Sequence, residues 1–309
     1  MQTAFKSIVV FLLVIIGSNM AAQNSVGIYN MSSGSPEGGS SLVILENGKF
    51  VILYFGGAQI GYWKNTGNNT ILFTPYKEES SFQVYGRKNN LLKNKIKIAF
   101  FGFENASTFI SSHTSKPKTF KRVFNEDANC FAPLYTKVFD AYTKEIYFAV
   151  EQGLKDPEVV SFGTEGYNDF VAYYIPSPQI DSFVGVMKED KLYIEENEGV
   201  VKRDLPSEGE DILFIRDLAN SIDQVEDVKN FNPQYNSFQA ELPSYYVFDE
   251  SKGAYIDLDE YKEGMELDIE EYDYDDISIL YEYKRCIPNI RKASNITIDE
   301  GSVFIERCE

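Results

Sequence analysis

Short runs of alternating apolar and polar residues, separated by tight turns, dominate the chain. SLVILE (41–46) and KFVILYF (49–55) flank Asn47–Gly48, a pair that favours a two-residue hairpin turn because both residues tolerate positive φ. Gly56–Gly57 then turns the chain again. Strands of about six residues joined by such turns are typical of an antiparallel meander. We therefore predict that residues 26–113 form one antiparallel up-and-down sheet, closed into a barrel or strongly curved.

Further strand patterns and one helix pattern follow. Alternating runs continue through 144–197 and return in the C-terminal region. Residues 208–222 have helical spacing instead, and Ser207 with Glu210 forms a capping-box pattern at their start. Four apolar residues of this segment share one helical face: Ile215, Leu218, Ala219 and Ile222. The predicted fold class is mainly β, with antiparallel hairpin meanders, a barrel or strongly curved sheet at the N-terminal end, and one short helix near 208–222.

Four short motifs in the N-terminal region resemble those of small secreted bacterial lipocalin-like domains. They are GIY (27–29), GKF (48–50), GYW (61–63) and ILF (71–73). The resemblance covers residues 26–90 and departs from the family at Tyr29, where a Trp is common. It implies an antiparallel barrel or half-barrel, often with an apolar interior that holds a small ligand. It implies no catalytic residues.

The resemblance also implies which side chains point into the barrel. Trp63 is expected to point inward and to pack near Tyr29 at one end of the sheet. The candidate residues lining a ligand cavity are Val43, Ile52, Ile60, Trp63 and Ile71.

The sequence divides into a leader and three predicted regions. We expect a signal peptide at 1–22, the lipocalin-like β-meander at 23–125, and a second β region ending in the helix at 126–222. C-terminal β-hairpins are expected at 238–309, after a polar stretch that marks the boundary.

Residues 1–22 have the order of a secretion signal. A single charge, Lys6, precedes an apolar run from Ile8 to Ile16, and the small residues Ala21–Ala22 follow. Spanning a bilayer takes about 20 apolar residues, so this run is too short for a membrane anchor. We expect cleavage near Gln23 and export to the periplasm or the exterior, with no stable membrane span left after signal removal.

The three cysteines fit an oxidising compartment. Cys286 and Cys308 each follow a basic residue at the end of a strand pattern, so we predict a disulfide between them. Cys130 would then be left over as a small buried apolar residue.

Charge and motif content exclude several functions. A net charge of −18 disfavours nucleic acid as a partner. With His113 as the only histidine, multi-histidine metal sites cannot form. No cofactor motif is present, and we expect neither a cofactor nor a metal. The acidic run 256–276 could bind calcium, but its alternation favours a strand with one solvated acidic face.

These features favour a non-enzymatic exported binding protein. Its partner would be a small apolar ligand or another protein of the envelope or the extracellular space. The alternative is a carboxylate-dependent extracellular hydrolase that acts on glycans, because carboxylates are the one plentiful reactive group.

Overall fold

The computed structural model of the protein divides the chain into two compact units, each assembled from two separate stretches of sequence. The first unit combines the described residues up to Lys77 with those within 181–224, and the second contains the other described residues. The structure describes residues 25–31, 39–111, 119–131, 135–140, 142–153, 155–176, 181–195, 198–224, 227–232, 237–239, 242–262, 278–292 and 296–308.

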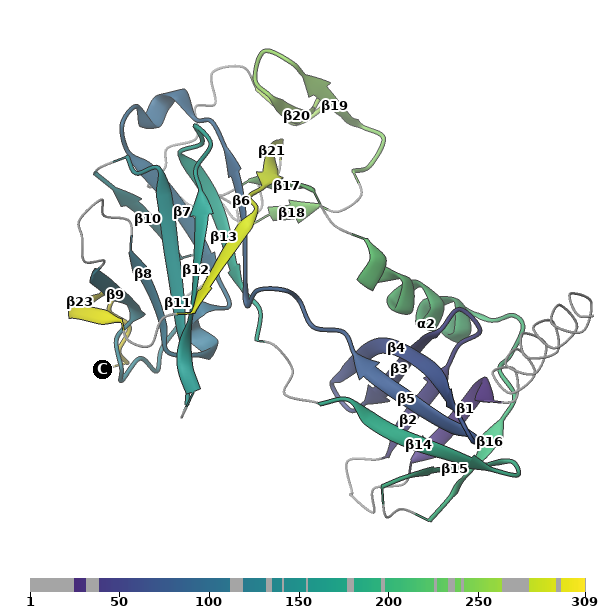
Figure 1. Ribbon diagram of the computed structural model, residues 1–309. Coiled ribbons are helices and arrows are strands. Elements are labelled where there is room, and N and C mark those ends of the chain that lie inside the picture. The colour runs from purple at the N-terminus through teal and green to yellow at the C-terminus, as the bar shows by residue number, and fades with distance from the viewer. Residues whose placement is uncertain are drawn as a thin grey trace, which may run out of the picture. The chain divides into compact units, whose positions relative to one another are not determined.

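The first unit is a closed barrel of eight strands, and every neighbouring pair is antiparallel (Figure 1). Around the barrel the order is β1 (Gly27–Met31), β16 (Val200–Arg203), β15 (Lys191–Ile194), β14 (Phe183–Lys188), β5 (Thr70–Pro75), β4 (Gly57–Gly67), β3 (Lys49–Tyr54) and β2 (Ser40–Ile44). The predicted mainly β fold with a barrel in its N-terminal part is confirmed.

The division of the chain differs from the consecutive regions predicted at 23–125, 126–222 and 238–309. The barrel is interrupted after Pro75 and resumes at Phe183, and the residues between these points belong to the second unit. Turn residues show where a strand ends, but they do not show which later strand will pair with it. An insertion inside a barrel therefore leaves no local signal in the sequence.

The hairpin between β2 and β3 has a three-residue turn instead of the predicted two-residue turn. The Leu45 N–H donates to the Lys49 carbonyl over 2.9 Å, which leaves residues 46–48 in the turn. Of these, only Gly48 has a positive φ, +79°. Asn47 contributes its side-chain oxygen instead, which accepts a hydrogen bond from the Lys49 N–H at 3.3 Å. After two-residue turns, three-residue hairpin turns with glycine in the left-handed position are among the most common.

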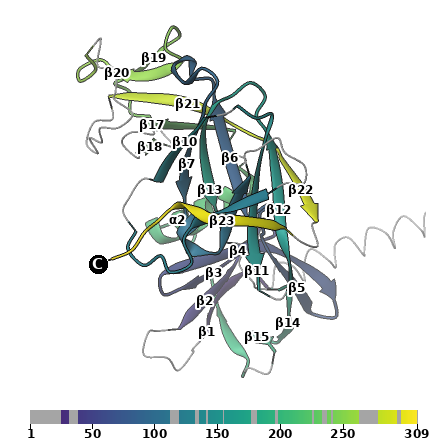
Figure 2. The ribbon, with the colours of Figure 1, turned by 90° about the vertical axis from the view of Figure 1, so that its left-hand side faces the viewer.

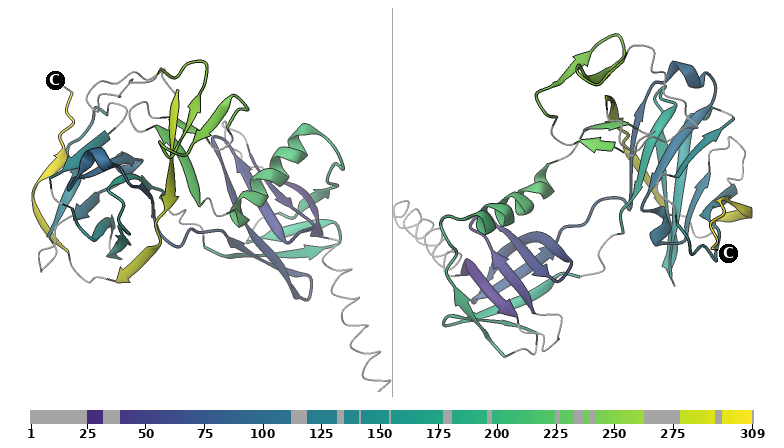
Figure 3. Two further views of the ribbon diagram at one scale, coloured as in Figure 1. Left: turned by 90° about the horizontal axis from the view of Figure 1, so that it is seen from above. Right: turned by 180° about the vertical axis from the view of Figure 1, so that it is seen from behind.

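One helix, α2 (Glu210–Asn220), packs on the outside of the barrel against β3 and β4, and a short 3₁₀ turn, η3 (Ser221–Asp223), follows it. Figure 3 shows the green helix along one side of the barrel in both views. The N-cap is Gly209 and makes no side-chain capping bond, so the predicted capping box of Ser207 and Glu210 does not form. The buried contact joins residues of both elements: Val43, Leu45, Val51, Ile212, Ile215 and Ala219.

The second unit consists of two sheets (Figures 1 and 2). The path of the nine-stranded sheet is β10 (Tyr135–Phe139), β7 (Ile96–Phe101), β13 (Asp169–Tyr174), β6 (Phe82–Arg87), β21 (Ile279–Arg285), β17 (Val228–Asn232) and β18 (Ser237–Gln239). Its two further strands are β20 (Ala254–Asp257), which pairs with β21, and β19 (Tyr246–Asp249). The six-stranded sheet has the order β22 (Pro288–Lys292), β12 (Lys155–Gly163), β11 (Glu145–Gln152), β8 (Thr108–Ser111), β9 (Thr119–Phe124) and β23 (Thr297–Phe304).

An aromatic core lies between the two sheets. Every second residue of a strand faces this core, as period-two alternation requires. Phe82 and Phe148 come from opposite sheets, and their ring centroids are 5.4 Å apart. Two short 3₁₀ turns connect strands of this unit, η1 (Asn90–Leu92) and η2 (Phe103–Asn105), and the Phe103 ring joins the same core.

This arrangement shortens the predicted N-terminal sheet. Residues 26–113 do not form one sheet, because β6 and β7 belong to the nine-stranded sheet and β8 belongs to the six-stranded sheet. Two strand pairs of the second unit are also parallel, β7 with β13 and β9 with β23. Parallel pairing requires distant partners, which hairpin signals cannot identify.

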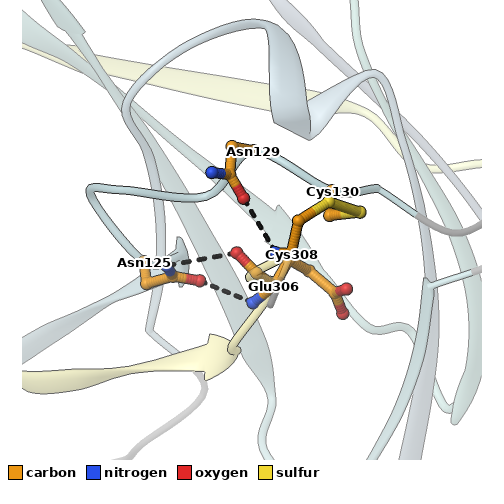
Figure 4. The surroundings of a disulfide bond; sticks show 5 residues. All are labelled: Asn125, Asn129, Cys130, Glu306 and Cys308. Atoms are coloured by element: carbon orange, nitrogen blue, oxygen red, sulfur yellow. Dashed lines mark hydrogen bonds between the residues drawn. A yellow bond between two sulfur atoms is a disulfide. The ribbon is translucent and has the colours of Figure 1, made fainter.

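The disulfide joins Cys130 to Cys308, not Cys286 to Cys308 as predicted (Figure 4). The parallel pair of β9 and β23 explains this, because it runs both chain segments past the same sheet end, with Phe124 opposite Phe304. Cys286 follows β21 into the sandwich core instead, where it is a free thiol. The predicted pairing is therefore wrong.

Hydrogen bonds hold the two segments together beside the disulfide. The Glu306 N–H donates to the Asn125 side-chain oxygen at 2.7 Å, and the Cys308 N–H donates to that of Asn129 at 3.0 Å (Figure 4). The C-terminal strand β23, yellow in Figure 2, is thereby fixed at the edge of its sheet.

Three features of the sequence lie outside the described residues. They are the signal pattern at 1–22, His113, and the part of the acidic run 256–276 that follows Lys262.

Candidate binding surface on the barrel

The five predicted cavity residues divide between the two faces of the barrel. Trp63 and Ile71 are buried in the interior cluster, and Ile52 packs against it. Val43 and Ile60 belong to the outer contact with α2. Residues that are paired across two neighbouring strands point to the same face of the sheet. Leu42 is paired with Ile52, and both belong to the interior. Val51 is paired with Val43 on one side and with Ile60 on the other. Val43 and Ile60 therefore face outward together.

Large side chains fill the barrel interior. Tyr29 and Trp63 lie in one buried cluster, as the family resemblance implies. The Phe73 and Phe183 rings are stacked with centroids 4.8 Å apart, and the Phe50 ring meets Phe73 edge-on at 5.3 Å. Interiors of eight-stranded barrels have just enough width for such packing.

The polar atoms of these interior residues are satisfied. The Trp63 indole N–H donates to the Leu45 carbonyl at 2.9 Å, and the Tyr29 hydroxyl donates to the Ser25 carbonyl at 2.8 Å. Burial raises the pKa of Tyr29 well above its ordinary value, with a further contribution from Asp190. The interior thus has the properties of a packed core.

The helix α2 presents a second apolar face on its outward side. Leu213 is 57 % exposed and Phe214 is 64 % exposed. Glu210 and Asp217 precede and follow them at helical spacing, so the outward stripe is acidic at both ends and apolar in the middle. The helix therefore carries an apolar face that its packing on the barrel does not use.

The tip of the β3–β4 hairpin adds two exposed aromatic side chains. Phe55 is 81 % exposed and Tyr54 is 49 % exposed. Gly56 takes the positive φ of the turn, +80°. Gly57 lies directly beneath the Tyr54 ring, where a Cβ would come within 2.9 Å of a ring carbon. The turn thus holds both rings at the surface.

The orientation of α2 directs its N-terminal half toward this hairpin tip. Asn220, at its C-terminal end, accepts a hydrogen bond from the Lys49 ammonium at 2.9 Å. Lys49 pairs with Tyr62 at the end of the hairpin opposite to the tip. An 11-residue helix is about 16 Å long, close to the length of β3. Leu53 and Ala58, beside the tip, pack against the cluster that contains Ile212 of the first turn of α2. We call Tyr54, Phe55, Leu213 and Phe214 the apolar strip.

Carboxylates surround the helical part of the apolar strip. Four of them are exposed and form no ion pair with another described residue: Glu208, Glu210, Asp211 and Asp217. The nearest basic side chain of the helix, Arg216, is already 3.6 Å from Glu46. The charge around Leu213 and Phe214 is therefore predominantly negative.

A buried ion cluster is the main electrostatic feature of the second unit. The Asp169 carboxylate is fully buried and lies 2.7 Å from the Arg87 guanidinium and 3.6 Å from the Lys97 ammonium. Arg87 also donates to the Tyr283 hydroxyl at 3.1 Å. Burial lowers the pKa of Lys97. Burial also acts to lower the pKa of Arg87, but Tyr283 and Asp169 raise it on balance.

This cluster joins the ends of β6, β7 and β13. A carboxylate-dependent hydrolase requires two carboxylates on either side of the scissile bond. Asp169 is the one buried carboxylate of the described residues, and its charged neighbours are cations. The arrangement is that of a structural ion pair.

The free thiol of Cys286 lies beside a small cavity of about 10 Å³, which is room for one water molecule. Burial raises the pKa of this thiol to about 12, with a further contribution from Glu165. A thiol with such a pKa is protonated at neutral pH and is a poor nucleophile.

The sequence analysis missed Leu213 and Phe214. The signal was present in ILFI (212–215), because four consecutive apolar residues span more than one face of a helix. The buried face takes Ile212 and Ile215, which leaves the middle pair outside.

No protein-family profile, no curated protein and no solved structure matches the chain. The closed eight-stranded antiparallel barrel is compatible with a lipocalin-like fold. Within the described part of the chain, no group of three or more His, Cys, Asp or Glu side chains is placed to hold a metal ion. None of the helices described is long and apolar enough to cross a membrane.

Proposed function

We propose that the chain is an exported, non-enzymatic binding protein that holds a partner protein outside the cytoplasm through the apolar strip. The observation that carries this proposal is the exposure of Leu213 and Phe214 on a helix whose opposite face is already buried. An apolar face of this kind contributes nothing to the folding of the unit. It gains free energy only when another surface covers it.

A protein partner is preferred over a small apolar ligand because of the barrel interior. Tyr29, Phe50 and Trp63 occupy the space that a ligand of a lipocalin-like barrel would need. We therefore use the resemblance of residues 26–90 to that family only for the barrel architecture. The proposed binding surface lies on the outside of the barrel.

Export is supported by two independent features. Residues 1–22 carry the pattern of a secretion signal. The Cys130–Cys308 disulfide fixes the C-terminal segment, and such bonds persist in oxidising compartments.

The test is site-specific photo-crosslinking in cells that export the protein. A photoreactive phenylalanine at position 214 or 55 should give an adduct of defined mass. The same photoreactive residue at position 201, where Val201 is 57 % exposed on β16, should give none. Equal adducts at all three positions, or none at positions 214 and 55, would contradict the proposal.

Vesicles provide a second arm of the test. Neutral phosphatidylcholine vesicles should not bind the protein. Binding that is lost in the Leu213→Ser/Phe214→Ser variant would reassign the apolar strip to a lipid surface.

A further inference from the structure

The charges around the apolar strip bear on the kind of partner, and this inference rests on the proposed function. Acidic side chains near a helix N-terminus stabilise the helix through its dipole, which accounts for Glu210 and Asp211 in the first turn. They would be present whether or not a partner exists.

Asp217 has no such explanation. It lies in the last turn of α2, which contains no basic residue, and a carboxylate is unfavourable at that end of the dipole. It is exposed and forms no ion pair with another described residue. It follows Leu213 and Phe214 on the outward stripe, at spacings of four and three residues.

We propose that the apolar strip binds a cationic amphipathic segment of a partner protein, with apolar side chains on Leu213 and Phe214 and a lysine or arginine beside Asp217. A helix with leucines on one face and basic residues along its margins has the complementary pattern. A second copy of this chain is disfavoured, because it would place the same carboxylates opposite one another.

The experiment uses the full mature chain and two peptides of about 14 residues, or four helical turns. One consists of leucine and lysine in an amphipathic pattern, and the other has glutamate in place of every lysine. Fluorescence anisotropy of the labelled peptides gives Kd. The lysine peptide should bind at least about tenfold more tightly than the glutamate peptide. Its affinity should fall between about 20 mM and about 300 mM salt, where the screening length shortens.

Two variants with the same change in net charge separate local from overall charge. Asp217→Lys should weaken binding of the lysine peptide by about three- to tenfold at low salt. Asp181 lies elsewhere on the same unit and its side chain is 98 % exposed. Asp181→Lys should change the affinity for the lysine peptide less than twofold, which is about 0.4 kcal/mol and within the additivity error for distant sites. Because Asp217 opposes the helix dipole, Asp217→Lys should also leave the stability equal or higher. If Asp217 had only a structural role, Asp217→Lys would not weaken peptide binding while the folded chain stays as stable as before.

The remaining outcomes distinguish the two proposals. If both peptides bind equally and Leu213→Ser/Phe214→Ser weakens both, the apolar strip is a binding surface but the cationic partner is overturned. If that double variant leaves binding of the lysine peptide unchanged, or if neither peptide binds, both proposals are overturned. If Asp217→Lys and Asp181→Lys weaken binding equally, only the overall charge matters and the role of Asp217 is overturned.

Discussion

The Lys49 ammonium donates a hydrogen bond of 2.9 Å to the side-chain oxygen of Asn220, the last residue of α2. The same ammonium forms an ion pair with Asp223 in the following turn. The helix has no basic residue in its own last turn, so a strand of the barrel supplies the cation that favours this end of the dipole. This contact holds the C-terminal end of α2 on the barrel, beside the apolar packing of Ile212, Ile215 and Ala219.

Replacing Lys49 by Met should therefore destabilise the barrel. The substitution keeps the apolar stem, which is almost fully buried, and removes the charged donor. The loss of a charge-assisted hydrogen bond predicts a decrease of about 1.5–3 kcal/mol in the free energy of unfolding. Urea denaturation followed by tryptophan fluorescence measures it, because Trp63 is the only tryptophan and lies inside the barrel. The control is Lys64→Met on the neighbouring strand β4. Lys64 is exposed, so its replacement should change stability by less than about 0.5 kcal/mol.

The contribution of Asp223 should depend on pH in the acidic range. Hydrogen bonds from Lys49 and Tyr62 hold the pKa of Asp223 below its ordinary value. A carboxylate with a lowered pKa in the folded state adds stability above its unfolded pKa and loses it as the pH falls through the folded value. The stability difference between the wild type and Asp223→Asn should thus be constant between about pH 5 and pH 8 and shrink below about pH 4. Urea midpoints across this range test it, and a change of the difference near neutral pH would contradict the assignment.

The disulfide pairing predicts a specific pattern of free thiols. Alkylation in denaturant without reductant should label Cys286 alone, because Cys130 and Cys308 are bonded. Cys130→Ser should expose Cys308 to labelling and lower the stability of the second unit by about 2–5 kcal/mol. Peptide mass spectrometry identifies the labelled residue. Labelling of Cys130 alone in the wild type would show that Cys286 and Cys308 pair instead, and labelling of all three would show that no disulfide forms.

Local sequence patterns predicted strands of the barrel, and the family resemblance implied its inward aromatic residues. Asn47–Gly48 placed the hairpin correctly, and Trp63 and Tyr29 do share the interior cluster. The hairpin depends on a few consecutive residues, so turn chemistry suffices to find it. Alternation alone did not assign the faces of the barrel, because Val43 and Ile60 face outward.

The remaining features depend on partners that are distant in the sequence. The barrel is closed by β14, β15 and β16, which follow a long insertion, and no residue of β5 indicates that β14 will pair with it. Cys308 meets Cys130 only because β23 runs parallel to β9. The binding surface was missed because the outward face of α2 becomes apparent only when its inward face is known.

The turn between β2 and β3 gives a prediction about backbone conformation. Gly48 has φ +79°, and a Cβ there would lie 3.8 Å from the Trp63 carbonyl oxygen, which is an ordinary van der Waals contact. A substitution at this position is therefore opposed by the backbone conformation and not by crowding. Gly48→Val should lower the free energy of unfolding of the barrel by about 1–3 kcal/mol, because a β-branched residue resists positive φ. Gly48→Asn should lower it less, because asparagine tolerates the left-handed region. Urea denaturation monitored by Trp63 fluorescence compares the two variants. If valine and asparagine cost the same, or if valine costs nothing, the left-handed conformation of residue 48 is incorrect.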